Sequence, residues 1–120
     1  SSPKFIAVEE ATKIYADGKG NILKIGKNIE EYNYIDLGVF MMRRNVLNKV
    51  IDLKKKTHVS FSDIIAEAAR KKCKVIVAEI KQGLWTDIDT PEDLEELLRG
   101  KRRTILNHVL REVLELAKRA

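Results

Sequence analysis

Two aspartates near the middle of the second half of the sequence have the pattern that most suggests chemistry. Asp87 and Asp89 are separated by a single residue, and Trp85, the single tryptophan, precedes them. Side chains two positions apart lie on the same face of an extended segment. Two carboxylates on one face favour a site for a hard cation, and Mg²⁺ is the usual choice beside phosphates. The structural alternative is that one of the aspartates caps the helix that follows.

That helix is expected over residues 91–99. Thr90 suits the N-cap position, Pro91 suits the first helical position, and Asp93 completes a capping box with the threonine. Gly100 is expected to end the helix. This start signal explains its own residues but gives no role to the tryptophan and the two aspartates before it.

Three residues in the first half of the chain also have types and positions that suit ligand binding. Asp36 interrupts the apolar run at residues 34–42, and a buried carboxylate needs a partner or a ligand. Gly38 would let a ligand approach the backbone closely. Lys27 lies in a polar loop, where its ammonium can meet a phosphate as a point charge. The structural alternatives remain open: a bulge in which the aspartate bonds a neighbouring loop, and a plain surface lysine.

The elements that must position these residues alternate between strands and helices. Two strands at residues 12–16 and 21–26 are expected to form a hairpin around an Asp-Gly-Lys-Gly turn. Further strands are expected at residues 4–8, 34–42 and 74–80, and further helices at residues 44–56, 59–72 and 104–120. In the helix over 59–72, Ser60 and Asp63 form a candidate capping box, and the expected buried face holds Phe61, Ile64, Ile65 and Ala68. This alternation predicts α/β layers.

Composition places the chain among small globular domains. Its 120 residues are 44% hydrophobic and 34% charged, and no apolar run approaches the length of a membrane span. The single cysteine, Cys73, excludes an internal disulfide and a zinc site built from several cysteines. We therefore expect a reducing, cytoplasmic setting.

The net charge of +5 is concentrated at the end of the chain. Residues 99–120 contain seven Lys or Arg and two Glu, so the rest of the chain is neutral. The expected helix at 104–120 has an amphipathic apolar stripe that suits packing or helix pairing, and contact with a membrane surface is an alternative. A specific nucleic-acid partner is not expected, because the body is neutral and aromatic residues make up only 6%. We expect a division into residues 1–100 and a basic helix at 101–120.

Taken in order, the motifs resemble a known family. "YIDLGVF" and "WTDIDTPEDL" are the specific parts, and the similarity runs over roughly residues 8–98. The chain resembles the C-terminal half of the nucleotidyltransferase domain that makes nucleotide-diphospho-sugars and polyols, in particular CTP:inositol-1-phosphate cytidylyltransferases of archaeal and thermophile type. In some such proteins this domain precedes a membrane-embedded CDP-alcohol phosphotransferase.

The resemblance implies a fold and an activity. The fold would be a three-layer, nucleotidyltransferase-like (Rossmann-like) partial α/β domain, with a mixed sheet, flanking helices and the C-terminal amphipathic helix. The activity would be Mg²⁺-dependent transfer of a nucleotidyl group from an NTP, with CTP favoured, to a sugar or inositol phosphate, releasing pyrophosphate. Trp85 would form a wall of the substrate site beside the metal, or part of the core.

The resemblance also assigns roles to the other candidate residues. Asp87 matches a metal-binding carboxylate of the family, with Asp89 as its neighbour. Lys27 matches the catalytic lysine that meets the acceptor phosphate. Asp36 and Gly38 match the turn that contacts the hydroxyls of the acceptor.

The nucleotide-binding half of the family pattern is missing from this sequence. Residues 1–34 contain no Gly-rich loop of the G-x-G-T-R type, which in the family follows the first strand. We therefore expect this chain to supply the acceptor and metal half of the site and to need a complementary N-terminal half for activity. The alternative is a non-catalytic module that assembles or self-associates through residues 104–120.

Overall fold

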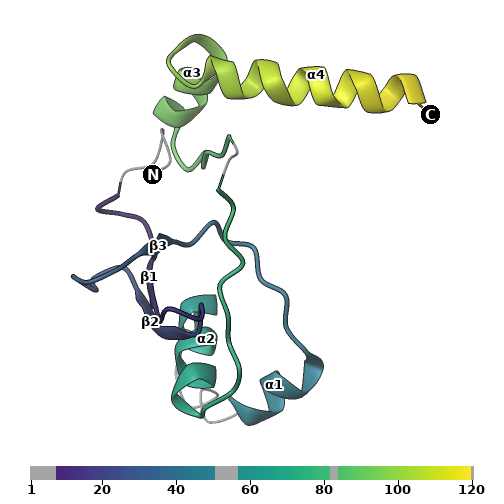
Figure 1. The fold of residues 1–120 in the computed structure, drawn as a ribbon. Helices are drawn as coiled ribbons and strands as arrows, with labels where there is room; N and C mark the ends of the chain where they lie inside the picture. Colours follow the sequence, from purple (N-terminus) through teal and green to yellow (C-terminus); the bar gives the residue numbers. More distant parts are fainter. Residues whose placement is uncertain (1–7, 51–56, 82–83, 120) are drawn as a thin grey trace. The chain divides into compact units, whose positions relative to one another are not determined.

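The computed structural model describes residues 8–50, 57–81 and 84–119. The chain forms two compact units, Ala7–Glu79 and Ile80–Ala120 together with Ser1–Ile6, and each is described here by itself. The elements of the first unit are β1 (Lys13–Ala16), β2 (Ile22–Gly26), β3 (Tyr34–Ile35), α1 (Arg44–Lys49) and α2 (Phe61–Arg70), as labelled in Figure 1. The elements of the second unit are α3 (Pro91–Arg99) and α4 (Arg103–Arg119).

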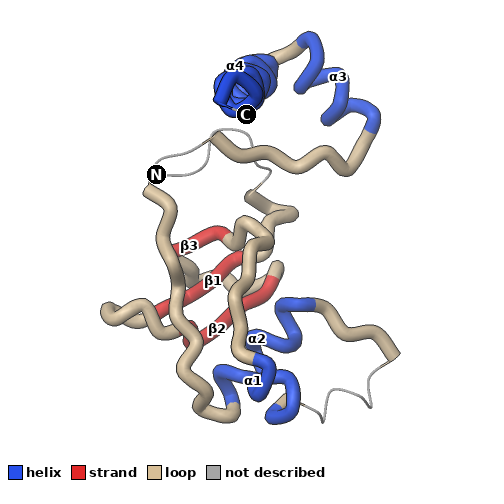
Figure 2. The backbone as a smooth tube through the Cα atoms, turned by 90° about the vertical axis from the view of Figure 1, so that its right-hand side faces the viewer, coloured by secondary structure: helices blue, strands red, loops and turns tan. Residues whose placement is uncertain are grey.

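The predicted hairpin is confirmed and forms the centre of the first unit. β1 pairs antiparallel with β2 on one side and with β3 on the other, so β1 is the middle strand of the sheet in Figure 2. The turn is closed by Asp17, whose carboxylate accepts hydrogen bonds from the amides of Lys19 and Asn21, each at 2.9 Å. Gly20 has a φ of +82°, a backbone conformation that residues other than glycine rarely adopt.

The strand expected at residues 34–42 is wrong beyond its first two residues, because β3 ends at Ile35. Asp36 turns its carboxylate back onto the amide of Gly38, at 2.7 Å, and Gly38 has a φ of +76°. A turn of this kind takes the chain out of the extended conformation, so pairing cannot continue. The sequence pattern indicated apolar residues at this place but not this local hydrogen bond.

The strand expected at residues 74–80 is also not present as a full strand. The segment makes one antiparallel bridge, between Asn21 and Ile76, directly before the start of β2. The Ile22 amide donates to the Val75 carbonyl at 2.9 Å, and the Val77 amide donates to the Gly20 carbonyl at 2.8 Å. The β-branched composition indicated a strand, but the segment meets only this end of the hairpin. The strand expected at residues 4–8 lies almost wholly outside the described residues.

The two helices of the first unit pack together, and α2 also packs on β2. The predicted capping box of α2 is confirmed: the Ser60 hydroxyl accepts from the Asp63 amide, and the Asp63 carboxylate accepts from the Ser60 amide. Ile65 and Ala68 are buried as expected. The expected burial of Phe61 is wrong, because its side chain is 59% exposed and stacks on the ring of Phe40.

The remaining helix predictions are confirmed where the structure describes them. The helix expected over 44–56 is present as α1 only as far as Lys49, with Val50 as its C-cap, and residues 51–56 of that prediction lie outside the described residues. In the second unit α3 begins after Thr90, ends before Gly100 and packs on α4. No helix in the described part of the chain is long and apolar enough to cross a membrane. The division at residue 100 stays a prediction.

The second unit leaves much apolar surface uncovered. Ile105, near the start of α4, is buried, whereas the apolar side chains of the later turns are exposed. Those exposed side chains are Val109, Leu110, Val113, Leu114 and Leu116. The stripe expected from the sequence is therefore present on α4 as an uncovered surface.

Candidate active site

The two aspartates lie in an extended segment that is anchored to the start of α3. Thr90 is the N-cap, with its hydroxyl 3.1 Å from the amide nitrogen of Asp93. The Asp93 carboxylate accepts in return from the amide of Thr90 and from that of Asp89, each at 3.1 Å. The capping box therefore reaches one residue further back than the sequence predicted. It fixes the backbone at Asp89 relative to the helix axis.

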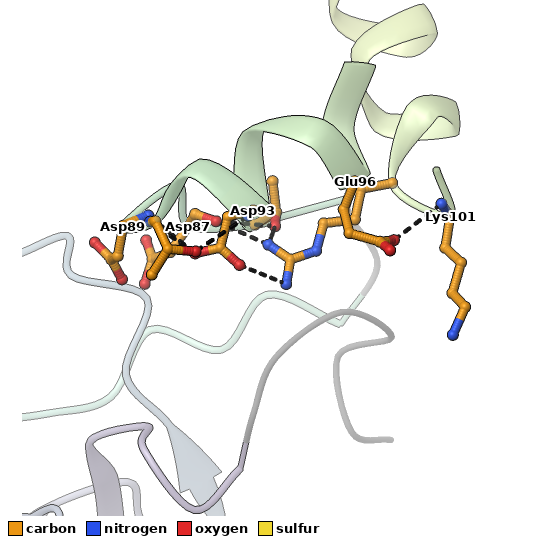
Figure 3. Close-up of polar contacts among 8 residues, drawn as sticks. Asp87, Asp89, Asp93, Glu96 and Lys101 are labelled. Carbon is orange, nitrogen blue, oxygen red and sulfur yellow. Dashed lines mark hydrogen bonds and ion pairs between the residues drawn. The ribbon is translucent and has the colours of Figure 1, made fainter. Parts of the chain in front are cut away.

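Arg102, which lies between α3 and α4, also binds this segment. Its guanidinium donates through Nη1 to the hydroxyl of Thr86 at 3.0 Å and to the carbonyl oxygen of Asp87 at 2.9 Å. Its Nη2 forms an ion pair with Asp93 Oδ1 at 3.1 Å. Figure 3 shows Asp87, Asp89 and Asp93, the carboxylates that precede and begin α3. Sequence analysis missed this residue, because its basic neighbours indicated only a charged tail.

Negative charge accumulates around Asp87. Burial raises the pKa of Asp87 above its ordinary value of 3.8, and the charges of Asp89 and Asp93 raise it further. Arg102 acts in the opposite direction and lowers it. The carboxylates are thus close enough to repel one another, as their neighbouring positions in Figure 3 suggest. A cation bound here would relieve this repulsion.

The carboxylate pair fits the way proteins bind Mg²⁺ beside a phosphorylated substrate. Mg²⁺ keeps several waters and is held by one or two carboxylates together with substrate phosphates. Within residues 8–50, 57–81 and 84–119 there is no group of three or more His, Cys, Asp or Glu side chains arranged to hold a metal ion alone. Asp87 and Asp89 could therefore supply the protein share of such a site, with the phosphates supplying the rest.

Trp85 is half-buried, and Thr86 beside it is also half-buried. Thr86 is fixed by its bond to Arg102, so the tryptophan precedes a segment of defined conformation. This makes Trp85 an intrinsic reporter for the two aspartates. Whether its ring contacts a substrate stays a prediction.

The three candidates of the first half lie in the other unit. Lys27 follows β2 directly, and its side chain is exposed. Its backbone carbonyl accepts a hydrogen bond of 2.9 Å from the ammonium of Lys13. Lys13 is buried, with 8% of its surface exposed, and its ammonium lies 5.8 Å from the ring centroid of Tyr32. This buried lysine could not be recognised from the sequence, because one charged residue at the start of a strand is ordinary.

Asp36 and Gly38 form a tight turn immediately after β3. The Asp36 amide donates to the Thr12 carbonyl at 2.9 Å, which ties the turn to the sheet. One carboxylate oxygen of Asp36 accepts the Gly38 amide, a bond within its own turn and not the bond to a neighbouring loop that the structural alternative expected. A Cβ on Gly38 would meet no atom within 4 Å, and its positive φ is what calls for glycine. Contact of this turn with an acceptor stays a prediction.

The six predicted site residues thus form two groups. Lys27, Asp36 and Gly38 lie at the ends of strands in the unit Ala7–Glu79. The other group, on the unit that includes Ile80–Ala120, comprises Trp85, Asp87 and Asp89.

Relatives of known function have similar sequences. A bifunctional IPC transferase and DIPP synthase from Archaeoglobus fulgidus is 30% identical over 98 residues, which cover 82% of this chain and 19% of that protein. Proteins of the same name from Rubrobacter xylanophilus and Thermococcus kodakarensis are 29% and 30% identical, over 82% and 85% of this chain and 23% of each relative. The chain therefore spans only about a fifth of the length of these curated relatives. No family model matches the chain.

A solved structure has a similar fold. The inositol-1-phosphate CTP transferase from T. maritima matches with a TM-score of 0.67 and 31% sequence identity, over 80% of this chain and 40% of that one. A score of this size at this identity supports both the predicted fold and the predicted resemblance. The chain is therefore related to part of the inositol-1-phosphate CTP transferases and bifunctional IPC transferases, and it has an α/β, nucleotidyltransferase-like fold.

Proposed function

We propose that this chain forms the acceptor- and metal-binding part of a nucleotidyltransferase that transfers a nucleotidyl group from CTP to an inositol phosphate. An oxygen of the acceptor phosphate would form a bond to the α-phosphorus of the triphosphate. The bond from that phosphorus to the bridging oxygen would break, and pyrophosphate would leave. The observation that carries this proposal is the Asp87–Asp89 pair, placed directly before α3 in a chain that shares this fold.

The proposed roles follow from charge and position. Asp87 and Asp89 would hold Mg²⁺, which when bound would neutralise charge on the phosphates. Lys27, exposed at the end of β2, would attract the acceptor phosphate. The turn formed by Asp36 and Gly38 would contact the acceptor hydroxyls.

The Gly-rich phosphate loop is not among the 120 residues of this sequence. We therefore infer that the triphosphate is held mainly by a complementary part that this sequence does not contain, and that the chain alone is inactive. Because the single cysteine, Cys73, is a free thiol, we also propose a cytoplasmic setting. The absence of a specific nucleic-acid partner stays a prediction.

The test is a titration of the whole chain with CTP, and separately with inositol 1-phosphate, with and without Mg²⁺. Trp85 fluorescence and calorimetry would both be followed. We expect saturable, Mg²⁺-dependent binding of inositol 1-phosphate that is lost in Asp87→Asn, and weaker binding of CTP, because most of the triphosphate site lies in the complementary part. Glu92→Gln is the matched control, because it removes one negative charge from the exposed first turn of α3 and should leave binding unchanged.

A second pair of variants tests the acceptor group. Lys27→Met should weaken inositol phosphate binding, whereas Lys24→Met, which removes an exposed lysine from β2, should not. Equal binding by wild type and Asp87→Asn at every Mg²⁺ concentration would count against the metal assignment. Equal binding by the two lysine variants would count against the acceptor assignment.

A second function is favoured by the uncovered apolar stripe of α4. The five exposed side chains from Val109 to Leu116 would support assembly through this helix, with contact to a membrane surface as the other use of a basic amphipathic helix. Sedimentation distinguishes assembly through α4 from a monomeric enzyme part. Self-association that rises with concentration and is lost in Leu110→Glu would support assembly, and a monomer at high concentration would contradict it.

A further inference from the structure

Arg102 contacts three separate groups around the aspartate pair. Its Nη1 lies 3.0 Å from Thr86 Oγ1 and 2.9 Å from the Asp87 carbonyl oxygen, and its Nη2 lies 3.1 Å from Asp93 Oδ1. The first two acceptors precede α3, and the third belongs to its first turn. One guanidinium therefore ties the extended segment to the helix.

The carboxylate of Asp93 extends this connection to the second aspartate. Its Oδ1 pairs with Arg102, while its Oδ2 accepts from the amides of Asp89 and Thr90 at 3.1 Å each. The backbone at Asp87 is thus held by the guanidinium, and the backbone at Asp89 is held by that guanidinium's own partner. Together the two contacts fix the segment at both of its carboxylate-bearing positions.

The environment of this ion pair differs from that of the Arg99–Glu95 pair, which belongs to the same unit. The side chains of Arg102 and Asp93 are 20% and 23% exposed, whereas those of Arg99 and Glu95 are 76% and 60% exposed. Exposed pairs contribute little because water and salt screen them. The Arg102–Asp93 pair is mostly shielded from water, and the guanidinium also binds two neutral oxygens. These contacts together restrain the conformation of the segment before α3.

We propose that Arg102 is a positioning residue that holds residues 86–89 in the conformation in which Asp87 and Asp89 present their carboxylates together to a divalent cation. This inference rests on the proposed function of the two aspartates. It adds a residue that touches neither the cation nor the substrates and acts through the segment it binds.

Charge alone would give Arg102 the opposite effect. A positive charge near a cation site repels the cation, so loss of that charge by itself should strengthen binding. A positioning role predicts weaker binding, because the carboxylates lose their shared orientation. The sign of the change therefore separates the two explanations. Lysine keeps the charge but lacks the planar fork that reaches several acceptors at once.

The test is Mg²⁺ binding to the whole chain, measured by calorimetry with inositol 1-phosphate present, because substrate phosphates complete the coordination of Mg²⁺. We expect Arg102→Lys and Arg102→Met to weaken Mg²⁺ binding by about 10-fold or more, as is typical when a supporting hydrogen bond behind a metal ligand is lost. Thr86→Val, which removes one of the three acceptors, should weaken it less. Arg99→Lys and Arg99→Met are the matched controls and should bind as wild type does.

Unchanged affinity in Arg102→Lys, or increased affinity in Arg102→Met, would overturn the proposal. Circular dichroism should show that both variants keep their helices. If unfolding makes either unusable, the Thr86→Val variant provides the decision, because it leaves the Arg102–Asp93 pair intact. Wild-type affinity in a folded Thr86→Val variant would then overturn it.

Amide hydrogen exchange separates failure of this inference from failure of the proposed function. Wild-type chain that does not bind Mg²⁺ overturns the metal site and the cation-presenting role together. In that case faster exchange at Asp89 and Thr90 in Arg102→Lys would still establish that the arginine orders the segment. If the wild-type chain binds Mg²⁺ and Arg102→Lys binds it equally well, the positioning role of Arg102 is overturned, and the metal site itself is not.

Discussion

The ammonium group of Lys13 lies 2.9 Å from the backbone carbonyl oxygen of Lys27 and 3.3 Å from that of Ala11. Lys13 is on the central strand of the sheet and is buried, whereas the side chain of Lys27 is exposed. One lysine thus anchors the backbone of the other. The loop that bears the proposed phosphate-binding lysine is attached to the sheet at this point.

Removing this anchor should destabilise the first unit. In Lys13→Met the apolar stem is kept, but two carbonyl groups lose a charged donor. We expect a loss of about 1–3 kcal/mol in the free energy of opening of β1, because hydrogen bonds to charged groups contribute more than neutral ones. Amide exchange across β1 and β2 measures this. Lys24→Met, at an exposed site on β2, should change it little, and equal effects of the two variants would contradict the anchor.

The hairpin turn should have a defined dependence on pH. The pKa of Asp17 lies below its ordinary value of 3.8, chiefly because the Asn21 side chain and then the Asn21 amide donate to its carboxylate. A lowered pKa means that the folded state binds the proton more weakly than the unfolded state does. The stabilisation of the folded hairpin by the ionised Asp17 carboxylate is therefore fully present above pH 3.8. It is lost as the pH falls through the lower pKa that Asp17 has in the folded state.

NMR titration of the Asp17 carboxyl group checks this cause directly. Asn21→Ala should raise the pKa of Asp17 towards its ordinary value, because it removes the largest contribution. Lys19→Met should raise it less, since the charge of Lys19 is the smallest of the effects that lower it. A larger effect from Lys19→Met would contradict the assignment to hydrogen bonding.

The side chain of Asn33 satisfies both backbone polar groups of Ala16, the last residue of β1. Its Oδ1 accepts the Ala16 amide at 3.0 Å, and its Nδ2 donates to the Ala16 carbonyl at 2.8 Å. In Asn33→Asp the donor becomes an oxygen that faces the carbonyl. We expect a loss of stability of about 1–3 kcal/mol, measured by amide exchange in β1. Asn28→Asp, at an exposed position in the same loop, is the control and should have little effect.

The junction between α3 and α4 should tolerate no side chain at Gly100. A Cβ there would lie 2.8 Å from Glu96 Oε2 and 3.0 Å from Glu96 Cα. The Glu96 carboxylate would have to move and lose the hydrogen bond of 3.1 Å that it accepts from the Lys101 amide (Figure 3). We expect Gly100→Ala to cost about 1–3 kcal/mol in thermal or urea unfolding, as overpacking commonly does.

Gly18→Ala is the matched comparison for this substitution. A Cβ on Gly18 would meet no atom within 4 Å, and its φ is not positive. We expect a change within about 0.5 kcal/mol, as for other surface sites without special features. Similar losses from both substitutions would contradict the steric explanation.

Local signals in the sequence predicted the parts of the fold whose cause is local. The capping boxes of Ser60 and Thr90 and the turn at Asp17 depend on residues within a few positions of one another. Helical periodicity similarly located α2, α3 and α4. The family resemblance rested on short motifs of the same kind.

Strand length was decided by contacts that no local pattern records. The runs at residues 34–42 and 74–80 have strand-like composition, yet the strand in the first ends at Ile35 and the second makes a single bridge at Ile76. A strand needs a partner along its length, and partners come from elsewhere in the chain. Composition reports only that an apolar segment could pair.

The sequence by itself determined the residue types that could bind Mg²⁺ and phosphate, and it determined where α3 begins. Only the tertiary structure decided which residues support them. Arg102 reaches Thr86 across 16 positions, and Lys13 reaches Lys27 across 14. A long basic side chain looks the same in sequence whether it is solvated or buried against carbonyl groups. Its role depends on which acceptors the folded backbone brings within hydrogen-bonding distance.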